Sequence, residues 1–320
     1  MQSPFLRPGF ACFPEDRKYL FFVPPMQQQP DSSVHISYNE RLHHFIREAL
    51  DEDMGDGDHS TLCCISAHQQ GSALLVSQSS GILAGVQVAI AIFQWLDPTC
   101  QILQFKEDGN PIQPGEKILQ VTGPMRSILS AERLVLNCMQ RMSGIATLTR
   151  KYVDRLAGSH TRLLDTRKTT PNFRLLEKEA VRIGGGVNHR MGLYDYIMLK
   201  DNHIDACGGI REAIRRAKAY MKQHGLQLPV EVETRNLQEV NEALEEGGIQ
   251  RIMFDHFSPA QVKQAVQLVN GRCETEASGN IELDNIAAYA ATGVDFISVG
   301  AITHQAVSLD MHLKYLPPAS

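Results

Sequence analysis

Six short apolar segments alternate with helical segments in the second half of the chain, and this alternation constrains the fold more than any other feature. A strand followed by a helix and another strand implies parallel strands joined by right-handed crossovers. Short apolar strands of this kind suit a sheet that is covered on both faces. The pattern therefore predicts a TIM-like α/β barrel that is incomplete. The predicted strands are 162–165, 194–199, 230–233, 250–254, 272–276 and 295–299, and the predicted helices are 174–183, 209–223, 237–246, 259–269 and 283–292.

The first half of the chain mixes helices and strands in a different rhythm. Apolar residues recur at helical spacing over 38–53 and 86–95, and strand-like runs lie at 72–77, 81–84, 102–106 and 117–122. A long helix begins near Ser130, whose hydroxyl can cap it, and carries Arg141. We therefore predict a smaller α+β open sandwich domain at 36–147, which precedes the α/β barrel domain at 148–304. Residues 1–35 end in a Pro/Gln/Ser-rich run and are predicted to be a flexible tail.

Charge and cysteine content argue against several classes of protein. The 320 residues carry a net charge of −5, so no general basic field favours nucleic-acid binding. The seven Cys form no C-x-x-C pair and are odd in number, so we expect no disulfide framework and a reducing, cytoplasmic location. The longest apolar run, 82–96, is too short to span a membrane. Glu15 and Asp16 argue against a signal or transit peptide.

Basic residues are concentrated between 163 and 203. Arg167 and Lys168 directly follow the first barrel strand, and Lys200 directly follows the second. The carboxyl ends of parallel strands form the active-site rim of such folds. In a chain without a general positive charge, this local cluster indicates a small substrate with several negative charges. The cluster consists of Arg167, Lys168, Arg174, Lys178, Arg182, His189, Arg190, Lys200 and His203.

The remaining predicted strands also end in polar or small residues. Glu233 and Asp255 end successive strands, where they bind Mg²⁺, face a developing cation, or form salt bridges with the basic rim. Small residues at 278–280 and 298–301 let backbone N–H groups approach a phosphate, and His304 adds a donor. Lys200 is also a candidate Schiff-base lysine, although no neighbour in the sequence activates it.

Eight motifs, in order across 38–313, resemble the quinolinate phosphoribosyltransferase (decarboxylating) family, also called nicotinate-nucleotide pyrophosphorylase. The resemblance implies transfer of phosphoribose from phosphoribosyl pyrophosphate to quinolinate, which yields nicotinate mononucleotide, pyrophosphate and CO₂ in de novo NAD biosynthesis. It also implies a homodimer, or a hexamer, in which the small domain of one subunit covers the barrel mouth of the other. The C-terminal segment 305–320 would return to the first domain. The motifs are EDMGDGDHST, LNCMQRMSGIATLT, DTRKTTPNFRLLEKEAV, GGGVNHRMGLYDYIMLKDNH, VEVET, FDHFSP, EASGNI and TGVDFISVGAITH.

The same resemblance implies three groups of site residues and no nucleic-acid or membrane partner. Catalytic roles fall on Lys168, Lys200, Glu233 and Asp255, and Glu233 and Asp255 would also face ribose and bind Mg²⁺. Arg141 would act on the partner subunit's site. The quinolinate group is Arg141, Thr166, Arg167, Lys168, His189, Arg190 and Lys200. The 5′-phosphate group is Ser278, Gly279, Asn280, Val299, Gly300, Ala301 and His304.

Three departures and three rivals accompany the resemblance. Asn172 and Phe173 stand where the family usually has Gly–Leu, His256 stands where Asn is common, and Asn280 stands where Gly is common. A nicotinate phosphoribosyltransferase is one rival, but a substrate with one carboxylate needs fewer cations. A non-catalytic nucleotide-binding protein on the same barrel is the second, and a Schiff-base aldolase is the third.

Overall fold

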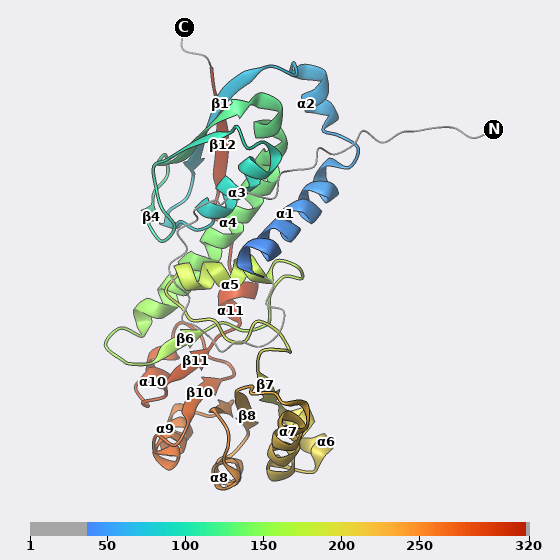
Figure 1. Ribbon diagram of the computed structural model, residues 1–320. Coiled ribbons are helices and arrows are strands. Elements are labelled where there is room, and N and C mark those ends of the chain that lie inside the picture. The colour runs from blue at the N-terminus through green and yellow to red at the C-terminus, as the bar shows by residue number, and fades with distance from the viewer. Residues whose placement is uncertain (1–36, 318–320) are drawn as a thin grey trace, which may run out of the picture. The chain divides into compact units, whose positions relative to one another are not determined.

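The computed structural model describes residues 37–317 of the chain (Figure 1). The tail predicted at 1–35 lies outside these residues. A small antiparallel sheet precedes an open ring of parallel strands, which confirms the predicted α/β class with an incomplete barrel. Over the described range, no helix is both long enough and apolar enough to cross a membrane.

A four-stranded antiparallel sheet holds the first part of the chain together, in the order β12-β1-β5-β3. Along β1 the buried Ala73 and Leu75 alternate with the partly exposed Ser72 and Leu74, as expected for a sheet with one covered face. The last strand, β12, pairs with β1 so that Leu313 lies opposite Leu75. The strands are β1 (Gln70–Ser77), β3 (Gln101–Gln104), β5 (Lys117–Pro124) and β12 (Met311–Leu316), with a separate two-stranded ribbon of β2 (Gly81–Ile82) and β4 (Pro111–Ile112).

Helix α4 connects this sheet to the barrel. It packs against α3, β1 and β5 at one end and against α5 of the barrel at the other (green in Figure 1). Gly144 allows the close approach of α4 to the end of the chain, because a Cβ at this position would lie 2.2 Å from the carbonyl oxygen of Val307. The helices of this part are α1 (Tyr38–Met54), α2 (His59–Cys64), α3 (Val86–Leu96) and α4 (Met125–Arg155).

Six parallel strands form the barrel sheet, in the order β6-β11-β10-β9-β8-β7. Strands β6 and β7 stand at the two ends of this order, so the ring is open between them. The strands are β6 (Arg162–Leu164), β7 (Ile197–Leu199), β8 (Val230–Thr234), β9 (Arg251–Asp255), β10 (Glu274–Ser278) and β11 (Phe296–Ser298). Sequence periodicity predicted all six, within a few residues at the ends.

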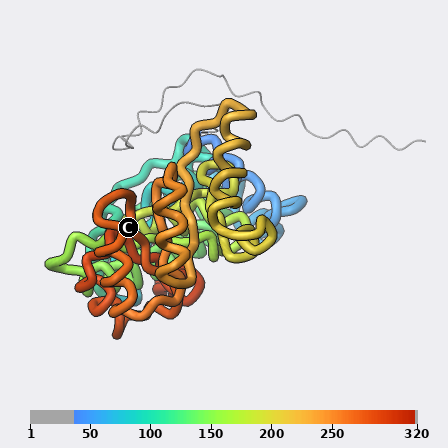
Figure 2. Tube along the Cα trace, turned by 90° about the horizontal axis from the view of Figure 1, so that it is seen from below, coloured from blue at the N-terminus to red at the C-terminus, as the bar shows by residue number. Residues whose placement is uncertain are grey.

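The crossover helices cover the outside of this sheet. Helices α7, α8, α9 and α10 contact one another in turn, and they form the yellow-to-red row in Figure 2. Helix α6 was not predicted, because it follows the charged end of β7 directly; the ring of His203 accepts the Lys200 N–H and so helps to start it. The barrel helices are α5 (Arg174–Ile183), α6 (Asp201–Cys207), α7 (Ile210–His224), α8 (Leu237–Glu246), α9 (Pro259–Val269), α10 (Ile286–Ala290) and α11 (Ala301–His304).

The inside of the barrel carries charge, which is unusual for a packed core. Glu231, Arg251 and Glu276 are buried on three neighbouring strands. Glu231 and Glu233 are two residues apart on β8, and side chains at this spacing share a face of a strand. The deep charges therefore lie below the rim residues on the same face of the sheet.

Candidate active site

Three predicted site residues meet where β6 and β11 end side by side. Leu164 pairs with Ser298, so the loops that follow these strands are neighbours. A Cβ on Gly300 would lie 2.9 Å from the Lys168 side chain and 3.3 Å from the His304 ring. The Lys168 carbonyl accepts the Thr303 hydroxyl at 2.9 Å. Because residue 300 is a glycine, the side chains of Lys168 and His304, both of which can donate to an anion, pack closely against its backbone.

The turn that leads to Lys168 is held by its own side chains and by the core. The Thr166 hydroxyl accepts the Lys168 N–H at 3.1 Å, which fixes the turn after β6. Val299 is buried, and its N–H donates to the Leu164 carbonyl at 3.1 Å. Ala301 then begins α11. These contacts give Thr166 and Val299 a part in shaping the rim.

Glu233 and Asp255 also come together, at the ends of the paired strands β8 and β9. Burial raises the pKa of the Glu233 carboxyl, and the Asp255 carboxylate raises it further. The Lys200 ammonium lies 3.8 Å from Glu233 and partly offsets this repulsion. Two neighbouring carboxylates that repel each other at a rim are a suitable donor set for Mg²⁺, which prefers carboxylate oxygens.

The residues after β9 and β10 share a tight turn. His256 Nδ1 lies 2.8 Å from the Asp255 carboxylate, and the His256 N–H donates to the Ser278 carbonyl at 2.8 Å. The imidazole covers Gly279, where a Cβ would lie only 2.7 Å from the ring. Gly279 has φ +95° and Asn280 has φ +53°, both in the left-handed region. Glycine is therefore required at 279 both for space and for backbone conformation.

Arg167 and Arg190 form the least neutralised part of the site. Burial lowers the pKa of the Arg190 guanidinium, and the positive charge of Arg167 lowers it further, so the two cations are close. The Nε of Arg167 is buried and has no hydrogen-bond partner within the described residues. In the same range, neither arginine forms an ion pair with a carboxylate. Arg190 donates from Nη1 to the Tyr196 carbonyl at 3.2 Å. This geometry suits an incoming dianion, because guanidinium matches carboxylate in a bidentate manner.

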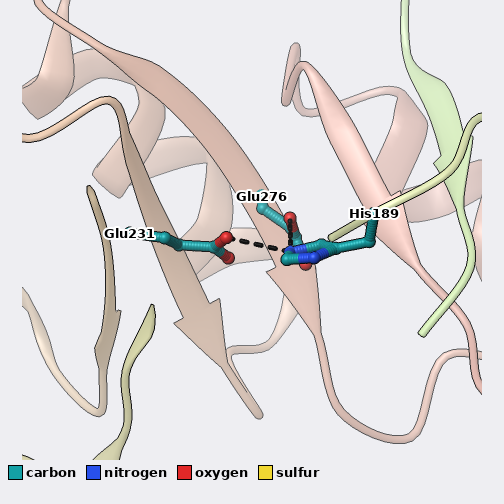
Figure 3. A group of neighbouring side chains, drawn as sticks. All are labelled: His189, Glu231 and Glu276. Carbon is teal, nitrogen blue, oxygen red and sulfur yellow. Dashed lines mark hydrogen bonds and ion pairs between the residues drawn. The ribbon is translucent and has the colours of Figure 1, made fainter. Parts of the chain in front are cut away.

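His189 is placed differently from the prediction that it contacts quinolinate. Its Nε2 lies 2.9 Å from Glu231 and 3.6 Å from Glu276, as drawn in Figure 3. Its Nδ1 accepts the backbone N–H of Arg190 at 2.7 Å. Both ring nitrogens are therefore engaged within the protein, and the side chain is only 7% exposed. Burial lowers the pKa of His189, which favours the neutral ring.

The group of His189, Glu231 and Glu276 is the one set of three or more potential metal ligands that lies close together in the described part of the chain. It does not suit a metal ion. Nδ1 accepts a hydrogen bond from a backbone N–H, so in the neutral ring Nε2 carries the proton and offers no lone pair. Glu276 also accepts Arg251 Nη1 at 2.9 Å. Burial raises the pKa of Glu231 and of Glu276 to about 7, so the group retains protons near neutral pH.

Arg141, which was predicted to act on the partner subunit's site, is engaged within its own chain. Its Nε and Nη2 donate to one carboxylate oxygen of Glu177 at 3.0 and 2.9 Å. Nη1 and Nη2 donate to the carbonyls of Ala306 and Thr303, each at 2.7 Å. Glu177 is fully buried. The guanidinium therefore holds α4, α5 and the end of α11 together within its own chain.

Sequence reasoning missed Glu231, Glu276 and Arg251, although a signal was present. Each stands inside an apolar strand motif, in VEVET, EASGNI and the run RIMFD. On strands with both faces covered, such charges must be paired inside the barrel. The buried pair of Lys178 and Asp165 was missed for a different reason, because Lys178 was counted among the substrate-binding cations of the basic cluster.

Comparison with known proteins gives close relatives over most of the chain. A relative from Oryza sativa subsp. japonica, the chloroplastic nicotinate-nucleotide pyrophosphorylase [carboxylating], is 44% identical over 88% of this chain and 79% of its own length. A mitochondrial quinolinate phosphoribosyltransferase [decarboxylating] 2 from Nicotiana glauca is 42% identical over 88% and 83%. The crystal structure of NadC from Streptococcus pyogenes superposes with a TM-score of 0.81 at 39% identity, covering 89% of this chain and all of that one.

These relatives also correct one expectation. The cytoplasmic location predicted from the cysteines and from Glu15 and Asp16 is wrong. Plant relatives of this chain are named chloroplastic or mitochondrial. Cysteine usage reports a reducing environment, and a reducing environment is not confined to the cytosol. The two acidic residues lie in a segment outside the described residues.

Family models identify both parts of the chain. The quinolinate phosphoribosyl transferase N-terminal domain matches residues 58–143, and the C-terminal domain matches residues 145–314. The domain limits at 36, 147 and 304 stay predictions. Together the two matches cover most of the described fold, including both sheets, and the chain belongs to the quinolinate phosphoribosyltransferase family.

Proposed function

We propose that Arg167 and Arg190 bind the two carboxylates of quinolinate at the barrel rim. The chain is a decarboxylating quinolinate phosphoribosyltransferase of de novo NAD biosynthesis, as its relatives at 42–45% identity are. The observation that carries the pocket assignment is the pair of adjacent, partly buried guanidinium groups, neither of which forms an ion pair with a carboxylate among residues 37–317. A dianion neutralises both charges, whereas nicotinate, with one carboxylate, leaves one of them unpaired.

The phosphates of the co-substrate are assigned to the other side of the rim. Lys168 and His304 lie together against Gly300, and their two donors suit the 5′-phosphate. The turn at 278–280 offers backbone N–H groups near the same end of the sheet. Lys168 therefore lies between the proposed phosphate group and the proposed carboxylate group, and it can bind either anion as a compact charge.

Glu233 and Asp255 are the proposed magnesium ligands. Their mutual repulsion and their carboxylate chemistry support this role. When bound, Mg²⁺ would neutralise charge on the pyrophosphate group. The Lys200 ammonium, 3.8 Å away, offsets part of the negative charge of Glu233.

The chemistry requires little acid or base from the protein. Departure of pyrophosphate gives ribose C1′ oxocarbenium character, and we assign the Glu233 carboxylate to stabilise that charge. The pyridine nitrogen attacks C1′, and the ring becomes cationic. The C2 carboxylate then leaves as CO₂, because the electron pair that remains at C2 lies beside the positive nitrogen, and C2 takes up a proton. The arginine pair and Lys168 would act by positioning the two anions for attack.

A homodimer is also proposed. Leu193 and Tyr194, on the loop before β7, are 71% and 54% exposed. Exposed apolar side chains beside an active-site rim support a covering subunit. Sedimentation at micromolar concentration measures the assembly state, and a monomer at all concentrations would count against it.

The test measures CO₂ and pyrophosphate release from quinolinate, phosphoribosyl pyrophosphate and Mg²⁺, with nicotinate in a parallel reaction. Arg167→Ala and Arg190→Ala should each weaken quinolinate binding about 100-fold, as expected for loss of a charged bidentate contact. Arg216→Ala, an exposed arginine on α7, is the matched control. Wild-type quinolinate affinity in both pocket variants would refute the assignment, and turnover of nicotinate alone would favour the rival transferase.

A further inference from the structure

The segment that carries His189 and Arg190 lies where the ring of strands is open. Val187 forms a single parallel bridge with Leu164 of β6, and the next regular pairing begins at Ile197 of β7. Between these points the backbone has no strand ladder to hold it. Side chains must therefore fix the part of the chain from which Arg190 reaches the substrate.

His189 is held by its backbone from two sides. Its N–H donates to the Asp165 carboxylate at 2.8 Å, and its carbonyl accepts Lys178 Nζ at 3.0 Å. Asp165 and Lys178 also pair with each other, and both side chains are completely buried. These contacts anchor the main chain at residue 189 to β6 and α5, but they leave its ring and the following residue free to turn.

The ring supplies the remaining constraint. Nδ1 accepts the Arg190 N–H at 2.7 Å, and Nε2–H therefore points to Glu231, 2.9 Å away. This tautomer makes the imidazole a rigid link between β8 and the backbone of Arg190. If Glu231 offered no acceptor, the nearest described acceptor for Nε2–H would be Glu276 at 3.6 Å, too far for a hydrogen bond, and the ring would be free to rotate away from Arg190.

Two further charged side chains lie next to this link. Glu276 on β10 lies 3.6 Å from His189 Nε2, and Arg251 on β9 donates to Glu276 at 2.9 Å. Arg251 stacks over the Phe296 ring at 4.2 Å, which leaves it little freedom. The Tyr196 ring packs beside the imidazole at 5.9 Å. Glu231 on β8 and Glu276 on β10 thus both lie beside the imidazole, and Arg251 on β9 pairs with Glu276, as is typical of the supporting residues behind functional histidines.

We propose that Glu231 is a positioning residue for quinolinate: through the ring of His189 it fixes the backbone from which Arg190 reaches the substrate. The inference rests on the proposed function, in which Arg190 binds a carboxylate. In this proposal Glu231 affects quinolinate binding without touching quinolinate. Glu276, which lies beside the same imidazole, and Arg251, which pairs with Glu276, likewise make no contact with the substrate. Glu231 also interacts with the Arg190 charge, so the test must separate hydrogen bonding from charge.

The test compares Glu231→Leu, Glu231→Gln and the control Glu274→Gln by calorimetric titration with quinolinate and, separately, with phosphoribosyl pyrophosphate. Leucine removes the acceptor and should weaken quinolinate binding about 10- to 100-fold, with the co-substrate affinity unchanged within about twofold. Glutamine keeps an acceptor oxygen for Nε2–H and should stay within about threefold of wild type. Glu274, like Glu276, forms an ion pair with Arg251, but it is not among the described partners of His189. Glu274→Gln should therefore bind quinolinate normally. Equal loss in the leucine and glutamine variants would overturn the proposal in favour of a charge effect.

A double-variant cycle supplies the readout that a merely structural role would not change. If Glu231 acts through Arg190, Glu231→Leu combined with Arg190→Ala should bind quinolinate no more weakly than Arg190→Ala alone. Additive losses, or equal losses for both substrates, would overturn the positioning role. If Arg190→Ala alone has no effect, the proposed pocket fails, and the inference fails with it.

If Glu231→Leu does not fold, the variant His189→Asn tests the same link. His189→Asn keeps an acceptor near the position of Nδ1 but cannot reach Glu231. It should reproduce the selective loss of quinolinate affinity, and thermal unfolding near that of wild type would show that the barrel is intact. Normal quinolinate binding by a folded His189→Asn variant would refute the link through the ring.

Discussion

Lys178→Met is the substitution for which the structure predicts the largest loss of stability. The Lys178 ammonium contacts the Asp165 carboxylate and donates to the His189 carbonyl at 3.0 Å, and both charged side chains are 0% exposed. Methionine matches the length of the lysine stem, so the change removes charge and donors with little change in volume. It leaves a buried carboxylate that still accepts the His189 N–H and the Asn188 side-chain amide, each at 2.8 Å.

Removing one partner of a buried ion pair costs about 3–5 kcal/mol, because the other charge stays buried without compensation. In a protein of this size each kcal/mol lowers the unfolding midpoint by about 1.5 °C, so a decrease of roughly 5–8 °C is expected. Burial raises the pKa of Asp165 to about 6 even with Lys178 present. A carboxyl with a raised pKa in the folded state contributes stability below its unfolded pKa and loses it as pH rises through the folded value. Because loss of the lysine raises this pKa further, the destabilisation should be smaller at pH 5 than at pH 8.

Urea unfolding followed by circular dichroism at pH 5, 6.5 and 8 measures this directly. Lys222→Met, at an exposed position on α7, is the control for loss of a lysine charge. The double variant Asp165→Asn/Lys178→Met should recover part of the loss, since it leaves no buried charge. The reasoning is refuted if Lys178→Met stays within about 1 kcal/mol of wild type at pH 8, or if its loss of stability does not depend on pH.

Three further predictions concern the barrel and its rim. Burial raises the pKa of Glu276 to about 7, so the stability that its protonated form contributes is lost as pH rises from about 4.5 to about 7. In Glu276→Gln the slope of unfolding free energy against pH over this range should therefore be smaller, by at most one proton or about 1.4 kcal/mol per pH unit, and an unchanged slope would contradict this. Arg141→Ala should cost about 2–4 kcal/mol in urea unfolding, because it leaves the buried Glu177 without its cation, whereas a normal stability combined with lost activity would restore the role of Arg141 in catalysis. His256→Val should destabilise by about 1–2 kcal/mol while His256→Asn stays within about 0.5 kcal/mol, because a β-branched residue tolerates φ +58° poorly; equal stability of the two would contradict this backbone argument.

The strands and their polar ends could be predicted because both depend on local pattern. Parallel strands place their carboxyl ends on one rim, so Glu233 and Asp255 had to be neighbours once their strands were recognised. The same argument brought Lys168 near Gly300. No side-chain contact had to be known for either inference.

The environments of Arg141 and His189 could not be predicted in this way. An arginine on a helix has the same local sequence whether it is free or buried. The partners of Arg141 lie 36 to 165 residues away along the chain, and only tertiary structure brings them together. His189 likewise lies in a stretch that looks like a binding loop, and its neighbour Glu231 is 42 residues away. A cluster of cations therefore indicates an anion site without showing which cations are already paired.

The three departures from the family pattern have a common physical explanation. Asn172, His256 and Asn280 have φ values of 61°, 58° and 53°, and the one other described non-glycine residue with positive φ is Asn270, at the end of α9. Glycine and asparagine are the residues that enter the left-handed region most easily, and histidine is among those enriched there. The backbone conformation of the rim thus limits these positions to a few residue types. The substitutions at 172 and 280 keep within that limit, whereas His256 also adds an imidazole against Asp255. Of the three departures, His256 is therefore the one that changes the chemistry at the proposed metal ligands.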